Sequence, residues 1–357
     1  MTTLSSRPGA TGPFEEGRGP HARATMRDVA ALAGVSLKTV SRVVNHEAGV
    51  SPELAARVGR AAEQLDYRPN LTASNLRRAD QRTATIGLLV EDVGNEFFAA
   101  IHRGVEEVTR ERGVIVMAAS LDRDPDLERD LVSALASRRV DGLILTPTAP
   151  DQDYLATELR SRMPIVAVDR TPVGVDIDAV LTDNRAAAAR GVAHLIAHGH
   201  RRIAFIGGEE RLTTERDRFA GYADALADAG IAIDPALVHH GAADSDAGVE
   251  VAGAMLDSAK PPTAIFSGQN LITMGCVRAL RERGLRTTVA LVGFDDFAMA
   301  DLLDPAVTVV AQDAREMGRR AAELIFARMT DFDAPTTTQI VPAALITRGT
   351  GEIPAPR

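Results

Sequence analysis

The sequence predicts an all-α head of three short helices, followed by an α/β core with two lobes built on parallel sheets. Two observations predict this division. In residues 25–65, apolar positions recur at helical spacing after residues that favour helix N-termini. From Thr83 onward, apolar runs typical of buried strands alternate with amphipathic helical patterns in two successive rounds. Such alternation is typical of a parallel sheet covered by helices on both faces, and two rounds indicate two lobes.

The first two helices of the head are predicted on either side of one glycine. Thr25 is a good N-cap, with Asp28 three positions later as in a capping box. Gly34 tolerates positive φ and suits a tight turn, after which Ser36 caps the second helix. The segment Ser51-Pro52-Glu53 starts a third helix, with a cap, a proline at the first helical position and an acid in the first turn.

Two features of this head favour binding to duplex DNA. The second helix begins with small and polar residues that can reach base edges in a major groove. Residues 25–82 carry nine basic and six acidic side chains, whereas the whole chain has a formal net charge of −9. The basic groups of residues 67–82 would face phosphates. Helical spacing alone also fits an ordinary three-helix corner of a larger fold, so charge and composition decide between the two interpretations.

Length and composition set the remaining bounds. A chain of 357 residues indicates two or three domains. Cys276 is the single cysteine, which excludes an intramolecular disulfide and fits a reducing cytoplasm. No apolar run approaches the roughly 18 residues that span a bilayer. Residues 1–24 are rich in Gly, Pro, Ser and Thr and lack an apolar signal region, so we expect a disordered tail rather than a secretory signal.

A ligand site is predicted where the strands of the core end, because open α/β sheets bind ligands beyond the carboxyl ends of their strands. Phe97, Asp169, Arg218 and Asp295 are among the side chains that follow predicted strands. Carboxylates and arginines suit the hydroxyls of a sugar, and an aromatic ring suits its C–H face. This inventory favours a carbohydrate or another small polyhydroxylated ligand. Strands are predicted over residues 85–90, 114–119, 142–146, 165–168, 202–207, 236–240, 264–267 and 289–293.

Three strings, DVAALAGVSLKTVSRVVN, VSPELAARV and LDYRPNLTASNLRR, resemble the lac repressor (LacI/GalR) family of bacterial regulators. The resemblance extends from Thr25 to about Arg348. It implies a helix-turn-helix head, a hinge helix and a two-lobed core like that of periplasmic binding proteins, which binds an effector and dimerises. The implied domains are a tail at 1–24, the DNA-binding domain at 25–69, the hinge and linker at 70–82, the core at 83–350 (N-lobe about 84–184 and 312–332, C-lobe about 185–311 and 333–350) and a tail at 351–357.

The resemblance also implies which residues contact DNA. Leu37 and Lys38 begin the recognition helix, where related repressors choose their bases. The hinge helix, residues 70–78, folds in relatives only on operator DNA, and Leu76 matches the leucine that two subunits insert into one minor-groove step. The alternative for Leu76 is a core or linker leucine. The DNA-binding residues predicted in this way are Thr25, Ser36, Leu37, Lys38, Thr39, Ser41, Arg42, Asn45, Tyr67, Asn70, Ala73 and Leu76.

Effector contacts are implied in the same manner. Arg218 is preferred over Arg216 because it holds the family spacing R-x-x-G-Y. Many relatives have Asn-Asp where this chain has Gln269-Asn270, and the lost charge leaves the effector's identity open. Asp122 and Asp169 could instead be helix or turn caps, and Phe98 is assigned to the core. The effector-binding residues predicted are Phe97, Asp122, Asp169, Arg218, Gln269, Asp295 and Gln312.

Other classes of protein are disfavoured. The sequence lacks a GxGxxG dinucleotide fingerprint after any predicted strand, a phosphate-binding P-loop, a GxSxG elbow and an HExxH pair. We therefore expect no catalytic residues, no metal and no cofactor, and we interpret His198-Gly199-His200 as a helix C-terminal turn. A transport-type sugar-binding protein would need an export signal and would not carry the head. No leucine heptad follows Arg348, so a dimer is the default.

The predicted function is a sequence-specific transcriptional repressor whose affinity for a pseudo-palindromic operator is controlled allosterically by a small effector, a sugar or a sugar derivative. The partners expected are duplex operator DNA, this effector and a second copy of the chain, with no membrane. A regulator that responds to purines or nucleosides is the alternative for the same architecture.

Overall fold

The computed structural model describes residues 24–44, 49–68 and 82–357, and the chain divides into two compact units that meet at residues 81 and 82. The head and the core are therefore described separately. Most of the predicted N-terminal tail, the predicted hinge helix and the four DNA-binding candidates Asn45, Asn70, Ala73 and Leu76 lie outside the described residues.

The head contains the three predicted helices, α1 (Met26–Ala33), α2 (Leu37–Val44) and α3 (Pro52–Gln64). The carboxylate of Asp28 accepts hydrogen bonds from the backbone N–H and the hydroxyl of Thr25, each at 2.8 Å. Gly34 ends α1 with a φ of 61°, in the left-handed region that glycine adopts without steric cost. The helices pack around a small apolar core whose most buried members are Val29, Val40 and Val58.

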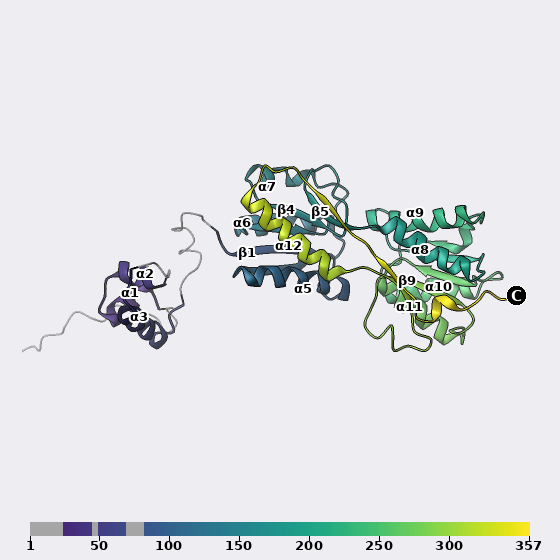
Figure 1. The fold of residues 1–357 in the computed structure, drawn as a ribbon, viewed down its shortest axis with the longest axis horizontal. Coiled ribbons are helices and arrows are strands. Elements are labelled where there is room, and N and C mark those ends of the chain that lie inside the picture. Colours follow the sequence, from purple (N-terminus) through teal and green to yellow (C-terminus); the bar gives the residue numbers. More distant parts are fainter. Residues whose placement is uncertain (1–23, 45–48, 69–81) are drawn as a thin grey trace, which may run out of the picture. The chain divides into compact units, whose positions relative to one another are not determined.

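The core contains two six-stranded sheets, one in each lobe (Figure 1). In the N-lobe all pairings are parallel, in the order β11-β5-β4-β3-β1-β2. In the C-lobe the order is β12-β10-β9-β8-β6-β7, and β12 alone runs antiparallel to its neighbour. The strands are β1 (Thr85–Val90), β2 (Ile115–Ser120), β3 (Gly142–Leu145), β4 (Ile165–Val168), β5 (Asp178–Thr182), β6 (Ile203–Ile206), β7 (Val238–His239), β8 (Ala264–Ser267), β9 (Ala290–Phe294), β10 (Thr308–Ala311), β11 (Thr338–Val341) and β12 (Ala344–Ile346).

Helices cover both faces of each sheet. In the N-lobe, α5 (Glu96–Glu111) and α12 (Ala314–Thr330) cover one face, and α6 (Pro125–Ser137) and α7 (Ala156–Arg160) cover the other. Gly104 allows α5 and α12 to approach closely, because a Cβ there would lie 2.0 Å from the Arg315 carbonyl oxygen. In the C-lobe, α8 (Asn184–Ala197) and α9 (Thr213–Asp228) lie opposite α10 (Ser245–Leu256) and α11 (Asn270–Glu282); the 3-10 turns are η1 (Asp153–Leu155), η2 (Pro235–Leu237) and η3 (Thr350–Glu352).

The chain passes between the lobes at residues 182–184, 311–314 and 341–344. The third of these passages corrects a predicted lobe boundary. β5, which the sequence did not predict, completes the N-lobe before the first passage, and β11 pairs in parallel with β5. Residues 338–341 therefore belong to the N-lobe, although 333–350 was assigned to the C-lobe. The apolar pattern of β11 is weak because this edge strand is half exposed, and Pro342 ends it.

The predicted C-terminal tail also needs correction. Thr350 donates from its hydroxyl to the Leu291 carbonyl oxygen at 2.7 Å, and Gly351 is buried beside Thr308. The Ile353 carbonyl oxygen lies 2.8 Å from Nε2 of His200. Residues 350–353 are thus packed on the C-lobe sheet rather than forming part of a free tail.

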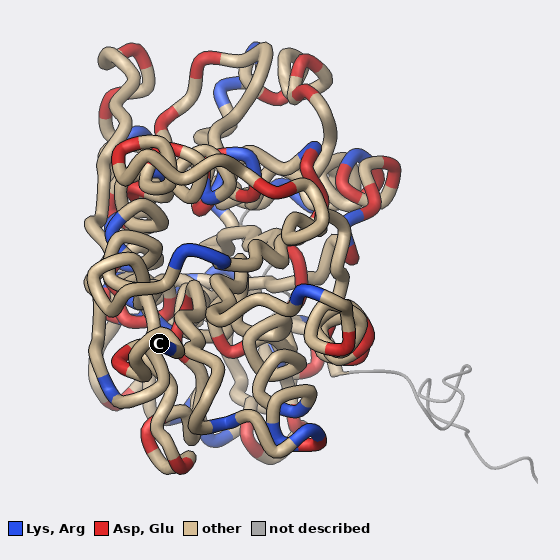
Figure 2. Tube along the Cα trace, turned by 90° about the vertical axis from the view of Figure 1, so that its right-hand side faces the viewer, with Lys and Arg blue, Asp and Glu red and all other residues tan. Residues whose placement is uncertain are grey.

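The exposed loops of the core carry acidic and basic residues side by side (Figure 2). Among the helices that the structure describes, none combines the length and apolar composition needed to cross a membrane.

Candidate functional site

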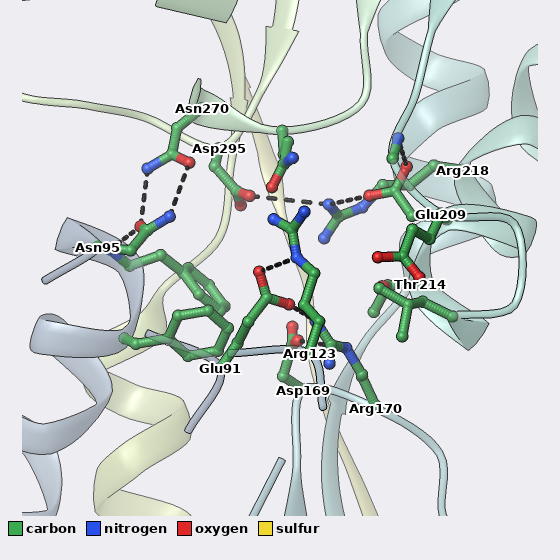
Figure 3. A pocket seen from close by; sticks show the side chains of 16 residues that line it. Glu91, Asn95, Arg123, Asp169, Arg170, Glu209, Thr214, Arg218, Asn270 and Asp295 are labelled. Atoms are coloured by element: carbon green, nitrogen blue, oxygen red, sulfur yellow. Dashed lines mark hydrogen bonds and ion pairs between the residues drawn. The ribbon is translucent and has the colours of Figure 1, made fainter. Parts of the chain in front are cut away.

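A pocket of the core lies between the lobes, at the carboxyl ends of strands from both sheets (Figure 3). Eight of its sixteen lining residues are charged, five acidic and three basic. The N-lobe contributes seven of the lining residues and the C-lobe contributes nine. The residues are Glu91, Asn95, Phe97, Phe98, Arg123, Asp169, Arg170, Gly208, Glu209, Leu212, Thr214, Glu215, Arg218, Gln269, Asn270 and Asp295.

Five of the seven predicted effector-binding residues line this pocket, namely Phe97, Asp169, Arg218, Gln269 and Asp295. The structure does not bring the other two into the lining. Asp122 is exposed, and its neighbour Arg123 lines the pocket instead. Gln312 stands behind Asp295, to whose Oδ1 its Nε2 donates at 2.6 Å.

The structure also bears on the other roles considered for Asp122, Asp169 and Phe98, as helix caps or as core residues. Asp124, rather than Asp122, caps α6 by accepting the Asp126 N–H at 2.9 Å. Asp169 has a φ of 71° directly after β4, and begins no helix. Phe98 packs in the apolar core as expected, although its edge also lines the pocket.

Glu91 is the centre of an ion cluster at the end of β1. Its Oε1 accepts from Nε of Arg123 at 2.7 Å, and its Oε2 contacts Nη2 of Arg170. Arg170 is buried and also donates to the Pro147 carbonyl oxygen and the Thr148 hydroxyl. Burial by itself would raise the pKa of the Glu91 carboxyl, but the charges of Arg170 and Arg123 outweigh it and lower the pKa.

Asp169 is the carboxylate of the pocket that is least satisfied. Its nearest cation is Arg170, whose Nε lies 3.7 Å from Oδ2, too far for a hydrogen bond. Its Oδ1 is buried without a hydrogen-bond partner in the described part of the chain. Burial raises the pKa of this carboxyl to about 6, against the opposing charges of Arg170 and Arg218. Because buried polar atoms are nearly always paired, Oδ1 is an acceptor suited to a donor on a ligand.

Arg218, on α9, organises the C-lobe side. Its Nε donates to Oδ1 of Asn184 at 2.9 Å, and its Nη1 donates to the Gly268 carbonyl oxygen at 2.7 Å. The guanidinium lies 3.9 Å from the centroid of the Phe294 ring and within 4 Å of the carboxylates of Glu215 and Asp295. Burial raises the pKa of both carboxyls, and Arg218 opposes that shift.

The hydrogen bond between Arg218 and Asn184 links the pocket to a segment where the chain passes between the lobes. Asn184 begins α8 at the first passage between the lobes, and Gln312 lies in the second passage. Arg218 therefore connects the pocket to one passage directly, and Asp295 connects it to the other through Gln312.

The lobes also contact each other directly, mostly through residues outside the pocket lining. Arg211 donates from the C-lobe to the carbonyl oxygens of Thr148, at 2.7 Å, and Arg123, at 2.8 Å. The Ala298 N–H donates to Oε2 of Glu96 at 2.6 Å. These contacts describe a core with its lobes closed on each other.

Five charged residues of the pocket are absent from the predicted set of effector contacts, namely Glu91, Arg123, Arg170, Glu209 and Glu215. Glu91, Arg123 and Arg170 follow the ends of strands, where the ligand site was predicted, but the family resemblance does not select them. No spacing rule distinguishes Glu209 and Glu215 from solvated charges, and the structure identifies them only by their place in the pocket.

In the head, the predicted DNA-binding residues that the structure describes fall into three groups. Leu37 and Lys38 are exposed at the start of α2, as base-reading side chains must be. Ser36 and Thr25 are used within the head as helix caps, with Ser36 Oγ accepting the Thr39 N–H at 3.1 Å. Tyr67 packs against the apolar core of the head, and Ser41 and Arg42 are half-buried on α2.

The head and core together define a class of protein, a DNA-binding regulator with a ligand-binding core. Two family models match the chain: "Bacterial regulatory proteins, lacI family" over residues 25–70, and "Periplasmic binding proteins and sugar binding domain of LacI family" over residues 83–348. The chain belongs to the LacI family of bacterial transcriptional regulators, which confirms the expected family and fold.

Curated relatives and solved structures agree. The repressor CytR of Escherichia coli K12 is 30% identical over 328 residues, which cover 91% of this chain and 96% of CytR. GalR of the same strain is 32% identical over 335 residues, 93% of this chain and 97% of GalR. The structure of the lac repressor dimer bound to operator and the anti-inducer ONPF matches with a TM-score of 0.81 and 27% identity. The match covers 92% of this chain and 99% of the lac repressor chain. The structure of a complex of the regulator CelR with cellobiose matches with a TM-score of 0.68 and 34% identity. The match covers 92% of this chain and 100% of the CelR chain.

Proposed function

We propose that this protein is a dimeric repressor that acts in the bacterial cytoplasm and releases or binds a pseudo-palindromic operator according to a carbohydrate held between its lobes. In this proposal it binds its ligand without transforming it. The observation that carries the proposal is that Arg218 and Asp295 line the pocket and are also bonded to two of the three interlobe passages, through Asn184 and Gln312. A ligand that contacts them can bias the lobe angle, which is the two-state element that allosteric control requires.

The chemistry of the pocket supports a carbohydrate as effector. Hydroxyl groups donate and accept at once, and the pocket offers acceptors such as Asp169 Oδ1 beside the donors of Arg218. The related CelR and a LacI family regulator from Enterococcus faecium have been solved with cellobiose and with ribose.

A nucleoside or purine is the rival effector, since a relative from Photobacterium profundum is named as the repressor PurR. A nucleobase is commonly held by stacking on aromatic faces. The two aromatic lining residues, Phe97 and Phe98, are neighbours that meet edge-to-face in the apolar core, with centroids 5.1 Å apart. They supply one wall, which suits the C–H face of a sugar better than two-sided stacking of a base.

Operator binding is tested with the full-length protein. Its preferred site would be selected from random duplex DNA, and binding would be measured by fluorescence anisotropy with and without sugars, nucleosides and purines. We expect one selected site with two related half-sites, and a sugar that changes its affinity by ~5–150-fold. Failure to select any sequence would contradict the regulator; a response to nucleosides alone would replace the carbohydrate.

The proposed hinge is tested separately, with Leu76→Ala. If Leu76 inserts into a base step at the operator centre, the variant should lose affinity for the operator and keep its affinity for nonspecific DNA. An equal loss on both DNAs would contradict that role.

A further inference from the structure

Arg123 occupies an unusual turn directly after β2. Asp122 and Arg123 both have left-handed backbone conformations, with φ values of 48° and 59°. For residues other than glycine this costs about 1–2 kcal/mol each, so such a turn persists only where its surroundings hold it. Here the N–H groups of Leu121 and Asp122 donate to the carbonyl oxygens of Val90 and Glu91, at 2.8 and 2.9 Å.

The turn directs the Arg123 side chain into the ligand pocket. Figure 3 shows its guanidinium in the middle of the pocket, between Glu91 and Asp295. The side chain is only 16% exposed, and its Nε donates to Glu91 at 2.7 Å. Within the described residues, no hydrogen bond holds either of its terminal nitrogens, whereas both terminal nitrogens of Arg170 are engaged, by Pro147, Thr148 and Glu91.

Arg123 is also the arginine of the pocket that can leave most easily. Glu91 would keep its ion pair with the buried Arg170 if Arg123 moved away. The side chain of Arg170 is 5% exposed and that of Arg218 is also 5% exposed, and both are bonded to backbone carbonyl groups. The guanidinium of Arg123 is therefore held by one hydrogen bond in the space where a ligand would lie.

From this geometry we infer that Arg123 is a built-in occupant of the effector pocket, which the effector must displace before it binds. The inference rests on the proposed function of the pocket as an effector site. A hydroxyl of the effector takes over the hydrogen bond to Glu91 while the guanidinium moves outward. The occupant lowers the apparent affinity for the effector, because the binding-competent state is only a fraction of the population.

The C-lobe contributes to this state. Arg211 donates to the carbonyl oxygen of Arg123, so closure of the lobes clamps the turn that presents the occupant. The structure with closed lobes and an occupied pocket is thereby stabilised by the chain itself, and the effector competes with this state rather than with an empty cleft.

Occupancy can be tested without knowing the effector. Arg123→Gly removes the guanidinium and tolerates the left-handed turn. Methylguanidinium at millimolar concentration is the probe, and the melting temperature of the full-length protein is the readout. We expect saturable stabilisation of Arg123→Gly, and none of the wild type or of Arg103→Ala, whose arginine is 60% exposed on α5. Equal responses in all three proteins would overturn the inference.

A second variant and a second ligand complete the test. Arg123→Asn also accepts a left-handed backbone, so it replaces Arg123→Gly if that variant does not fold. With ribose and cellobiose, half-maximal response should occur at roughly three- to tenfold lower concentration in the variant than in the wild type. A higher concentration would identify Arg123 as a ligand contact and refute displacement. If methylguanidinium rescues but neither sugar nor any other carbohydrate binds, occupancy stands and the carbohydrate proposal fails.

Discussion

The side-chain amides of Asn95 and Asn270 pair reciprocally across the mouth of the pocket. Nδ2 of Asn270 donates to Oδ1 of Asn95 at 3.0 Å, and Nδ2 of Asn95 donates to Oδ1 of Asn270 at 3.3 Å. Both amides have fixed orientations, because Oδ1 of Asn95 also accepts the Phe97 N–H and Oδ1 of Asn270 accepts the Leu271 N–H. The pair joins the start of α5 to the start of α11, and therefore one lobe to the other.

The pair predicts a specific effect of charge at residue 270. In Asn270→Asp, an oxygen replaces the Nδ2 donor and faces Oδ1 of Asn95, so attraction becomes repulsion. We expect this variant to favour open lobes and to lower the melting temperature of the core. The check is hydrogen exchange of the amides at the starts of α5 and α11, which should become faster.

Neutral truncation measures the strength of the same pair. Asn95→Ala and Asn270→Ala should each destabilise the core by about 1–3 kcal/mol, since each leaves a buried amide unsatisfied. The double variant should cost less than the sum of the two, as expected of residues in contact. Additive effects would show that the pair does not couple the lobes.

Substitution of Arg218 should separate the response to the effector from DNA binding. Arg218→Ala should abolish the operator response to the effector and leave operator affinity without effector largely intact. It should also destabilise the core by about 3–5 kcal/mol, because Glu215 and Asp295 lose their buried cation. Arg218→Lys restores the positive charge but not the planar guanidinium group. It should therefore recover more of the stability of the core than of the operator response to the effector. Arg216→Ala, at an exposed site on the same helix, is the matched control and should keep both.

Lys38 offers a direct test of the recognition helix, because Lys38 and Lys260 are the two lysines of the sequence. Both are exposed, one at the start of α2 and the other in the C-lobe. Lys38→Ala should weaken operator binding by roughly 1–3 kcal/mol if the lysine contacts a base, and Lys260→Ala should change nothing. Acetylation followed by mass spectrometry provides an independent readout. Operator DNA should protect Lys38 alone, and equal modification of both lysines in the complex would rule out this contact.

Asp169 predicts a dependence of stability on pH. Its pKa in the folded protein is about 6, above the ordinary value of 3.8, so the folded state holds a proton that the unfolded state has released. The group therefore costs stability increasingly as pH rises from about 4 to above 6. Asp169→Asn removes that cost. The variant should melt at a higher temperature than the wild type at pH 7.5, and at nearly the same temperature as the wild type at pH 4.

Two observations would complete this test. Asp122→Asn, at an exposed site outside the pocket, should leave the melting temperature nearly unchanged at both values of pH. Asp169→Asn should also lose effector binding, because the amide cannot replace a charged acceptor. A variant that is no more stable at pH 7.5 would contradict the assigned desolvation of Asp169.

The sequence by itself determined the helices of the head and most strands of the core. The caps at Thr25 and Ser51, the turn at Gly34 and the apolar run of β1 act between near neighbours, so their pattern is visible along the chain. The strand order, the pairing of β11 with β5 and the return of residues 350–353 to the C-lobe were not visible, because edge strands carry little periodicity.

The tertiary structure alone decided how the pocket works. Glu91 meets Arg170 from 79 residues away, and Asn95 meets Asn270 from 175 residues away. Such contacts depend on which strand ends share a sheet edge and on how the lobes close, and no local pattern encodes either. The predicted contacts Phe97, Asp169 and Arg218 reached the pocket because they adjoin strand ends or the family motif. Arg123 lines the pocket where Asp122 was expected. Asp122 and Arg123 both have left-handed backbone conformations, and this turn decides which of the two side chains faces the pocket.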